Sequence, residues 1–331
     1  MATITKIKSK FKVQKKLIRY NNLLMKNIIL SGSTGFIGSN INKLLLSNEK
    51  IKLDLINLRQ TSHKIENEIK GKYYDVFIHS AGIHPLREGL ENLEVFSENE
   101  KILEKVENIF KISNKVILIS SFVNLINFSK KTIDENNKIN LNEEDNFYKK
   151  SKYSTEKFFY ELQSKYKNEL IIIYPCHVIG PEDYKLSPNG HYFKKTINQK
   201  INYYFDISYP LTDVREISNY IDYIVKEDLK SHKKIIINAS IRMSDYIKKI
   251  KNNEKNFINI GIYKVFYGFI SILNIILNKM YLSKKIYFPF STYKYILLDP
   301  KIASTNNNGY VNKYIVDKTI NDTLNFFKNH E

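Results

Sequence analysis

The sequence predicts an α/β fold in which a doubly wound parallel sheet is joined to a smaller C-terminal α/β domain. Three observations predict it. Short apolar runs alternate with segments of helical periodicity, a glycine-rich turn follows the first run, and several runs end in small or polar residues. Strands that alternate with helices form βαβ units and pair in parallel. Such sheets bind ligands beyond the carboxyl ends of their strands.

The first strand is predicted from an apolar run, and the first helix from the spacing of apolar residues that follow the glycine-rich turn. Residues 28–31 form a short buried run. The helix predicted over 36–47 places apolar side chains on one inner face: Ile37, Ile41, Leu44 and Leu45. Residues 53–58 predict a second strand. The segment 75–82 predicts a third, which ends in small residues.

The alternation continues to residue 175. A helix over 96–112 is predicted from apolar residues at helical spacing: Ile102, Leu103, Val106 and Phe110. Residues 116–119 form a strand that runs into two serines, residues 146–165 a helix, and residues 170–174 a strand closed by Pro175. The connection from 59 to 74 is short, which indicates a reduced strand–helix unit there.

The amino-acid composition limits the classes of protein and of site that are possible. The chain has 331 residues, of which 43% are hydrophobic, so it is able to bury a large core. Its single cysteine, Cys176, excludes an internal disulfide and fits a reducing, cytoplasmic location. The seven histidines form no Cys/His pair at metal-ligand spacing, so we predict no metal site.

The net charge of +18 comes almost entirely from lysines spread along the chain. Clustered arginines are absent, so we predict a solvated basic surface and no nucleic-acid partner. Residues 1–24 hold many lysines and no acid, and no long apolar stretch follows them as in a signal peptide. We interpret them as a basic extension, with the fold beginning at Met25.

The glycine turn is the first motif that carries chemistry. Gly32, Gly35 and Gly38 stand between a strand and a helix. A glycine backbone has no Cβ, so its amides and the helix N-terminus are able to approach a phosphate. The turn therefore predicts a dinucleotide site that also includes the residues between the glycines: Thr34, Phe36 and Ile37. A glycine pattern alone is a weak signal.

A phenol and an ammonium one helical turn apart form the second motif. Tyr148 and Lys152 project from one helix face at i and i+4. We expect the ammonium to lower the pKa of the phenol, which is then able to act as general acid or base. Tyr153 and Lys157 repeat the spacing, so spacing alone does not select the pair.

Further landmarks occur in a fixed order along the chain. They are Asp75–Gly82, Asn99, Ser120–Ser121, Tyr148–Lys152, Tyr174–Pro175, Gly180–Pro181, Thr212–Val214, Ile237–Ser240 and the stretch from Leu298 to Tyr310. With the glycine turn, this order resembles the extended short-chain dehydrogenase/reductases, the family of NAD(P)-dependent nucleotide-sugar epimerases, dehydratases and reductases. The resemblance covers residue 27 to the C-terminus and implies a Rossmann-type sheet.

The resemblance also implies roles. Ser121, Tyr148 and Lys152 match the family's catalytic residues, with Ser120 as the alternative serine and Lys152 also on the nicotinamide ribose. The matching cofactor-binding positions are Ser80, Ala81, Gly82, Asn99, Pro175 and His177. Tyr174 stands where the family carries arginine. No Asp-Glu pair follows the serines, which disfavours a dehydratase.

The end of the second predicted strand bears on the choice of cofactor. NAD enzymes usually place a carboxylate there for the ribose hydroxyls. This chain has Asn57 and Arg59 and no carboxylate. An arginine is suited to a 2′-phosphate. We therefore expect NADP or NAD, with NADP slightly favoured.

The predicted domains follow from these landmarks. Residues 25–180 form the nucleotide-binding domain, to which 205–240 return, and residues 181–204 and 241–331 form the substrate domain. The apolar run within 257–281 is too short to span a bilayer. It predicts a packed helix, with peripheral membrane contact as the alternative. The resemblance implies a homodimer.

We thus predict a nucleotide-sugar epimerase or reductase acting at C4, in surface polysaccharide synthesis. Two alternatives stay open from the sequence. One is a hydroxysteroid-type dehydrogenase, which would have an apolar cleft. The other is a non-catalytic protein that binds NAD(P) as a sensor.

Overall fold

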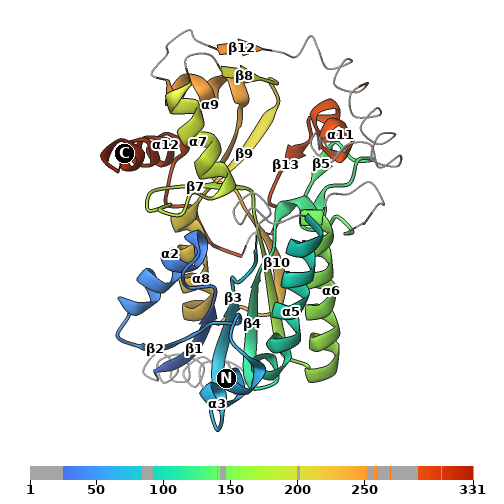
Figure 1. Cartoon of the computed structure of the whole chain (residues 1–331), viewed down its shortest axis with the longest axis vertical. Coiled ribbons are helices and arrows are strands. Elements are labelled where there is room, and N and C mark those ends of the chain that lie inside the picture. Colours follow the sequence, from blue (N-terminus) through green and yellow to red (C-terminus); the bar gives the residue numbers. More distant parts are fainter. Residues whose placement is uncertain are drawn as a thin grey trace, which may run out of the picture.

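A six-stranded parallel sheet is the centre of the computed structural model, which describes residues 25–83, 92–139, 141, 147–199, 202–251, 257–259, 269, 290–306 and 308–330. Its strand order is β10-β6-β4-β3-β1-β2 (Figure 1). The strands are β1 (Lys26–Ser31), β2 (Ile51–Ile56), β3 (Tyr74–His79), β4 (Ser113–Ile119), β6 (Glu169–Pro175) and β10 (His232–Ile236). The predicted Rossmann-type fold is confirmed.

Helices cover both faces of this sheet (Figure 1). One face carries α2 (Phe36–Leu46) and α8 (Val214–Glu227), and the other α3 (Ser62–Ile69), α5 (Asn92–Phe110) and α6 (Phe147–Tyr166). Successive strand side chains alternate between the faces. In β1, Ile28 and Leu30 pack under α2 and α8, while Ile29 packs under the opposite helices. This double burial explains why the strands are continuous apolar runs.

A second layer lies beyond the carboxyl ends of the sheet. Its three strands, in the order β11-β9-β7, are β7 (His177–Ile179), β9 (Ser208–Asp213) and β11 (Ala239–Arg242). Its helices are α7 (Pro188–Asn198), α9 (Met243–Ile250) and α12 (Val316–Asn329). Phe193, Tyr246 and Phe327 are buried at its centre. The exact division into domains remains a prediction.

Short elements complete the described chain. They are η1 (Phe122–Leu125), β5 (Thr132–Ile133), β8 (Asn202–Tyr204), β12 (Phe257–Asn259), α11 (Phe290–Leu298) and β13 (Lys301–Ile302). The predicted basic extension and most of the apolar segment 257–281 lie outside the described residues. Among the helices of the described ranges, none combines the length and the apolar character that crossing a bilayer requires.

The predicted second strand is placed two residues too late. The structure ends β2 at Ile56, and Asn57 begins a turn instead. The side-chain oxygen of Asn57 accepts a bond from the Arg59 amide at 3.0 Å, and its carbonyl accepts one from Gln60 at 3.2 Å. A single helix, α3, then leads to β3, which pairs with the other side of β1. No further strand pairs with β2, which is therefore an edge strand of the described sheet.

The opposite edge, β10, is covered by a buried carboxylate. Glu135 accepts hydrogen bonds from the Ile235 amide at 2.9 Å and the Thr305 amide at 2.8 Å. Burial acts to raise the pKa of Glu135, but bonds from Ser304 and these two amides lower it overall. The carboxylate therefore ties the edge strand to the segment that follows β13.

Candidate active site

The carboxyl ends of β1, β3 and β4 meet where the strand order reverses. From β1 the chain runs through α2 to β2 on one side, and then returns through α3 to β3 on the other. The glycine turn, the loop after His79 and the two serines after Ile119 follow these paired strand ends and are therefore neighbours. An open α/β sheet binds its ligand at such a switch point.

The glycines are required by close packing at two positions and leave space at the third. Gly32 has a φ of +79°, and a Cβ there would lie 2.6 Å from the Ala81 backbone nitrogen. A Cβ on Gly38 would overlap the Gly32 carbonyl oxygen. Among the described residues, a Cβ on Gly35 would meet only that oxygen, at 3.4 Å. This part of the structure thus leaves space beside Gly35 at the N-terminus of α2.

The other predicted residues of the turn surround this opening. Thr34 is exposed, while Phe36 is buried and begins α2. Ile37 is half-buried, and the first turn of α2 contains no acid and no side-chain cap. Backbone amides at such a helix end favour an anion. This cradle fits the pyrophosphate of a dinucleotide.

The loop after β3 is held by a buried amide. Asn99 of α5 accepts a bond from the Ile83 amide at 2.8 Å and donates to the Ile83 carbonyl at 3.1 Å. The preceding Ser80 amide donates to the Ser31 carbonyl at 3.2 Å. Ala81 and Gly82 lie between these two anchors. In the structure Asn99 therefore holds this loop, and its predicted role in cofactor binding stays a prediction.

The loop, α5 and α6 together enclose a small cavity. His79, Ala81, Gly82, Asn99, Tyr148 and Lys152 are among its lining residues. The structure therefore brings together five residues that the sequence analysis selected. His79 was not selected. Its Nδ1 lies 2.9 Å from Ser31 Oγ, and burial together with Lys152 lowers its pKa to about 3, so it is neutral.

The predicted acid–base group sits where β4 meets α6. Ser121 and Tyr148 are joined by a side-chain hydrogen bond. Lys152 donates to the Ile119 carbonyl at 3.5 Å, and its Nζ lies 6.0 Å from the Tyr148 ring centre. The helix supplies the phenol and the ammonium, and the strand end supplies the hydroxyl. These groups are the minimum for moving a proton at a substrate oxygen.

The charge states differ in part from the expectation. Burial lowers the pKa of Lys152 to about 8, while Glu156 acts to raise it. Burial also raises the pKa of Tyr148, and the bond to Ser121 acts to lower it. The expectation that Lys152 gives Tyr148 a lowered pKa is wrong for this arrangement, because burial dominates and the ammonium is turned toward Ile119.

The two serines have different partners. Ser121 bonds to Tyr148, whereas Ser120 donates to Glu156 Oε2 at 3.0 Å. Glu156 is buried and also accepts from Asn124 at 2.6 Å and from the Tyr174 hydroxyl. Sequence reasoning missed this carboxylate. The signal was present, because Glu156 follows Lys152 at the same four-residue spacing that separates Lys152 from Tyr148.

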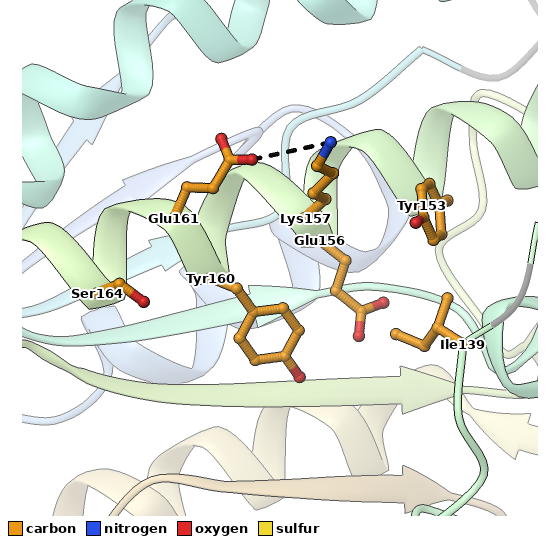
Figure 2. Close-up of a pocket in the computed structure, with 7 residues that line it drawn as sticks. All are labelled: Ile139, Tyr153, Glu156, Lys157, Tyr160, Glu161 and Ser164. Atoms are coloured by element: carbon orange, nitrogen blue, oxygen red, sulfur yellow. Dashed lines mark ion pairs between the residues drawn. The ribbon is translucent and has the colours of Figure 1, made fainter.

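The second Tyr/Lys pair lies elsewhere on α6. Tyr153 and Lys157 line a separate hollow of about 540 Å³, and Lys157 pairs with Glu161 at 4.0 Å. In Figure 2 the side chains of Glu156 and Tyr160 point from the helix toward the strands, whereas Lys157 and Glu161 do not. The repeated spacing thus belongs to another face of the helix.

The residues after β6 lie between the second layer and the two serines. Pro175 is buried at the end of β6. The His177 ring stacks on Tyr209 with centres 4.2 Å apart and meets Phe122 edge-on at 5.2 Å. Burial lowers the pKa of His177 to about 4, although a bond to Asn189 acts against this, so the imidazole is neutral. His177 therefore joins the two layers beside the serines.

Asn57 and Arg59 lie apart from this group, at the end of β2. Both are exposed. Arg59 acts electrostatically on Glu98 of α5, and Lys105 donates to the Leu58 carbonyl at 3.0 Å. Arg59 and Lys105 thus lie beside the acid Glu98 at this end of β2, and the preference for NADP stays a prediction.

Comparisons with known proteins bear on the family. A search of curated proteins finds no match by sequence. UDP-glucose 4-epimerase from Thermotoga maritima with UDP-glucose is similar at a TM-score of 0.64 and 14% identity, covering 92% of this chain and 99% of that one. UDP-glucuronic acid 4-epimerase from Bacillus cereus in complex with NAD gives 0.66 and 13%, with the same coverage of 92% and 99%. RMD from Pseudomonas aeruginosa complexed with NADPH gives 0.64 and 12%, again covering 92% and 99%.

These likenesses show the fold. A sequence model of the NAD dependent epimerase/dehydratase family matches residues 28–227. That range runs from β1 through α8 and contains the glycine turn, both serines and the Tyr148–Lys152 pair. It covers more than half of the 331 residues, and the chain belongs to the NAD-dependent epimerase/dehydratase family.

Proposed function

We propose that the protein is an NAD(P)-dependent epimerase or reductase that acts at C4 of a nucleotide sugar. The observation that carries the proposal is the group of Ser121, Tyr148 and Lys152 beside the glycine turn. A neighbouring lysine ammonium and a serine hydroxyl allow a tyrosine to exchange a proton with a sugar hydroxyl. A bound nicotinamide would accept or return the hydride.

Each side chain has one task in this proposal. Tyr148 removes the proton from the hydroxyl during oxidation and returns it to the carbonyl oxygen during reduction. Ser121 donates a hydrogen bond to the same oxygen. Lys152, which is turned toward Ile119 in the structure, acts in this proposal as the ammonium that stabilises the phenolate form of Tyr148 during proton transfer, against the effect of burial. Gly35 and the N-terminus of α2 hold the cofactor pyrophosphate, with Ser80, Ala81, Gly82, Pro175 and His177 around the nicotinamide end.

Two observations support a nucleotide sugar as substrate. The similar solved structures include UDP-sugar 4-epimerases. The chain's charge of +18 favours an anionic diphosphate. As part of the same proposal, the enzyme serves surface polysaccharide synthesis in the cytoplasm. It is a homodimer through α5 and α6, which pack against each other.

The test is to denature the purified protein and identify released dinucleotide by absorbance and mass spectrometry, and then to assay UDP-sugars. Retained NAD with interconversion of C4 epimers supports an epimerase. Empty protein that NADPH stabilises thermally, and that reduces a 4-keto sugar, supports a reductase. Failure to bind either dinucleotide would contradict the proposal.

Arg59 gives a prediction about cofactor choice. Arg59→Ala should weaken NADPH binding by about tenfold to a hundredfold and leave NADH binding unchanged, because a charge-assisted bond to the 2′-phosphate is lost. Titration of protein fluorescence with each dinucleotide measures this. Lys165→Ala, at the far end of α6 beside Glu107, is the control for net charge. Equal losses for both dinucleotides would remove the argument for NADP.

A further inference from the structure

Ile119, which ends β4, and the two serines after it are each hydrogen-bonded to a different residue of α6, and these three helix residues are spaced about one turn apart. The Ile119 carbonyl accepts from Lys152 at 3.5 Å, and Ser120 donates to Glu156 at 3.0 Å. Ser121 is bonded to Tyr148. The helix residues follow each other at intervals of four and therefore share one face. The bond between Ser120 and Glu156 thus sets how the strand end meets the helix.

Three hydrogen-bond donors surround the buried side chain of Glu156. The side chain is 1% exposed. Its bonded neighbours are the Ser120 hydroxyl, the Asn124 amide and the Tyr174 hydroxyl, each of which is able to donate. A carboxylate is an acceptor only, so three donors satisfy it. Burial raises the pKa of Glu156 overall, and these three bonds, which stabilise the carboxylate, offset that effect in part.

The charges near Glu156 come from two sides. Lys152 precedes it on α6, and Lys233 of β10 acts on it from the sheet edge. Lys233 also lies 5.4 Å from the ring centre of Tyr160, one turn further along α6. Tyr174 gives Glu156 a hydrogen bond and no charge. The positive charges that interact with Glu156 are those of Lys152 and Lys233.

We propose that Glu156 is a positioning residue for the acid–base pair, which holds the end of β4 against α6 through Ser120 and places a negative charge one helical turn from Lys152. This inference rests on the proposed function of Tyr148 and Lys152. Misplacing a reacting group by about 1 Å is enough to lower a rate a hundredfold. The bond from Ser120 prevents that displacement at Ser121.

The charge of Glu156 also has a consequence for pH dependence. Glu156, from its own helix, acts electrostatically on Lys152, and Lys152 acts on His79 of β3, which is neutral, while Tyr148 lies beside it. Among the described residues, Glu156 is the group that acts to raise the pKa of Lys152, which stands at about 8. Without that charge Lys152 loses its proton at lower pH. Lys152 is then uncharged over a wider part of the alkaline pH range, and over that range the ammonium beside Tyr148 is missing.

The test is the pH profile of kcat/KM for Glu156→Gln and Ser120→Ala. Glu156→Gln keeps the shape of the side chain and removes the charge, so the alkaline limit should move down by about 1 pH unit. Ser120→Ala removes the bond and keeps the charge. It should lower kcat about tenfold with an unchanged alkaline limit and unchanged cofactor affinity. Glu161→Gln, exposed on another face of α6, is the matched control and should behave as wild type.

Two results would overturn the inference while leaving the proposed function in place. They are a wild-type pH profile for folded Glu156→Gln, and a wild-type kcat for Ser120→Ala. If Glu156→Gln does not fold, as judged by circular dichroism, Ser120→Ala alone decides the positioning role. Tyr148→Phe, measured in parallel, distinguishes a failure of this inference from a failure of the proposed function. If it retains full activity the proposed function itself fails.

Discussion

Replacing Tyr148 with phenylalanine is expected to lower kcat by about 10³-fold or more, with fold and dinucleotide binding retained. The variant keeps the ring, so packing on α6 is preserved. It lacks the hydroxyl that Ser121 contacts, which is the group that we propose takes the proton from the substrate. One preparation should be used to measure the turnover of a UDP-sugar, the dinucleotide affinity and the Tm. Together these values separate a loss of catalysis from a loss of binding or of stability.

Tyr153→Phe is the matched control for that experiment. Tyr153 is on the same helix and is followed by Lys157 at the same spacing, but both line the separate hollow (Figure 2). We expect wild-type turnover from this variant. If Tyr153→Phe loses activity and Tyr148→Phe retains it, the chemistry takes place on the face of α6 that carries Tyr153, and our assignment of Tyr148 is wrong.

Gly38→Ala is expected to destabilise the protein by about 3 kcal/mol and to abolish dinucleotide binding. A Cβ at this position would overlap the backbone of Gly32, which has no flexible side chain that could move aside. The N-terminus of α2 would then have to shift away from the turn. Urea unfolding and fluorescence titration with NADH and NADPH measure the two losses.

Gly35→Ala distinguishes packing from ligand binding. Within the described part of the chain, its Cβ would contact only the Gly32 carbonyl oxygen, at 3.4 Å, and Gly35 is not among the glycines with a positive φ. The unfolding midpoint should therefore stay near wild type, while dinucleotide affinity falls because the new methyl group occupies the opening at the helix end. If affinity is unchanged in Gly35→Ala, the pyrophosphate does not lie against this turn.

Local patterns predicted most of the sheet and the position of the site. The strand over 28–31 and the helix behind it were identified because an apolar run, three glycines and a helical stripe are all readable within 20 residues of sequence. The same holds for Tyr148 and Lys152, whose shared face depends only on helix geometry. In both cases the determining contacts are close in sequence.

Contacts between distant residues could not be predicted in this way. Ser120 and Glu156 are 36 positions apart, and the Asn124–Glu156 bond spans 32. Which serine faces Tyr148 depends on this network. The net pKa direction of Tyr148 depends on burial, which the sequence alone does not reveal. The end of β2 was misplaced because the Asn57 side chain stops the strand by bonding to the Arg59 amide.

The order in which the sheet is assembled has a consequence for biosynthesis. β6 ends at Pro175, and its outer neighbour β10 begins only at His232, after the chain has passed through the second layer. The cover that Glu135 gives to β10 requires Thr305. While the ribosome adds the intervening residues, at ~5–20 per second, the apolar run of β6 is an open edge for on the order of ten seconds. A nascent chain of this protein is therefore expected to depend on chaperones late in its synthesis, and truncated chains ending before β10 to aggregate.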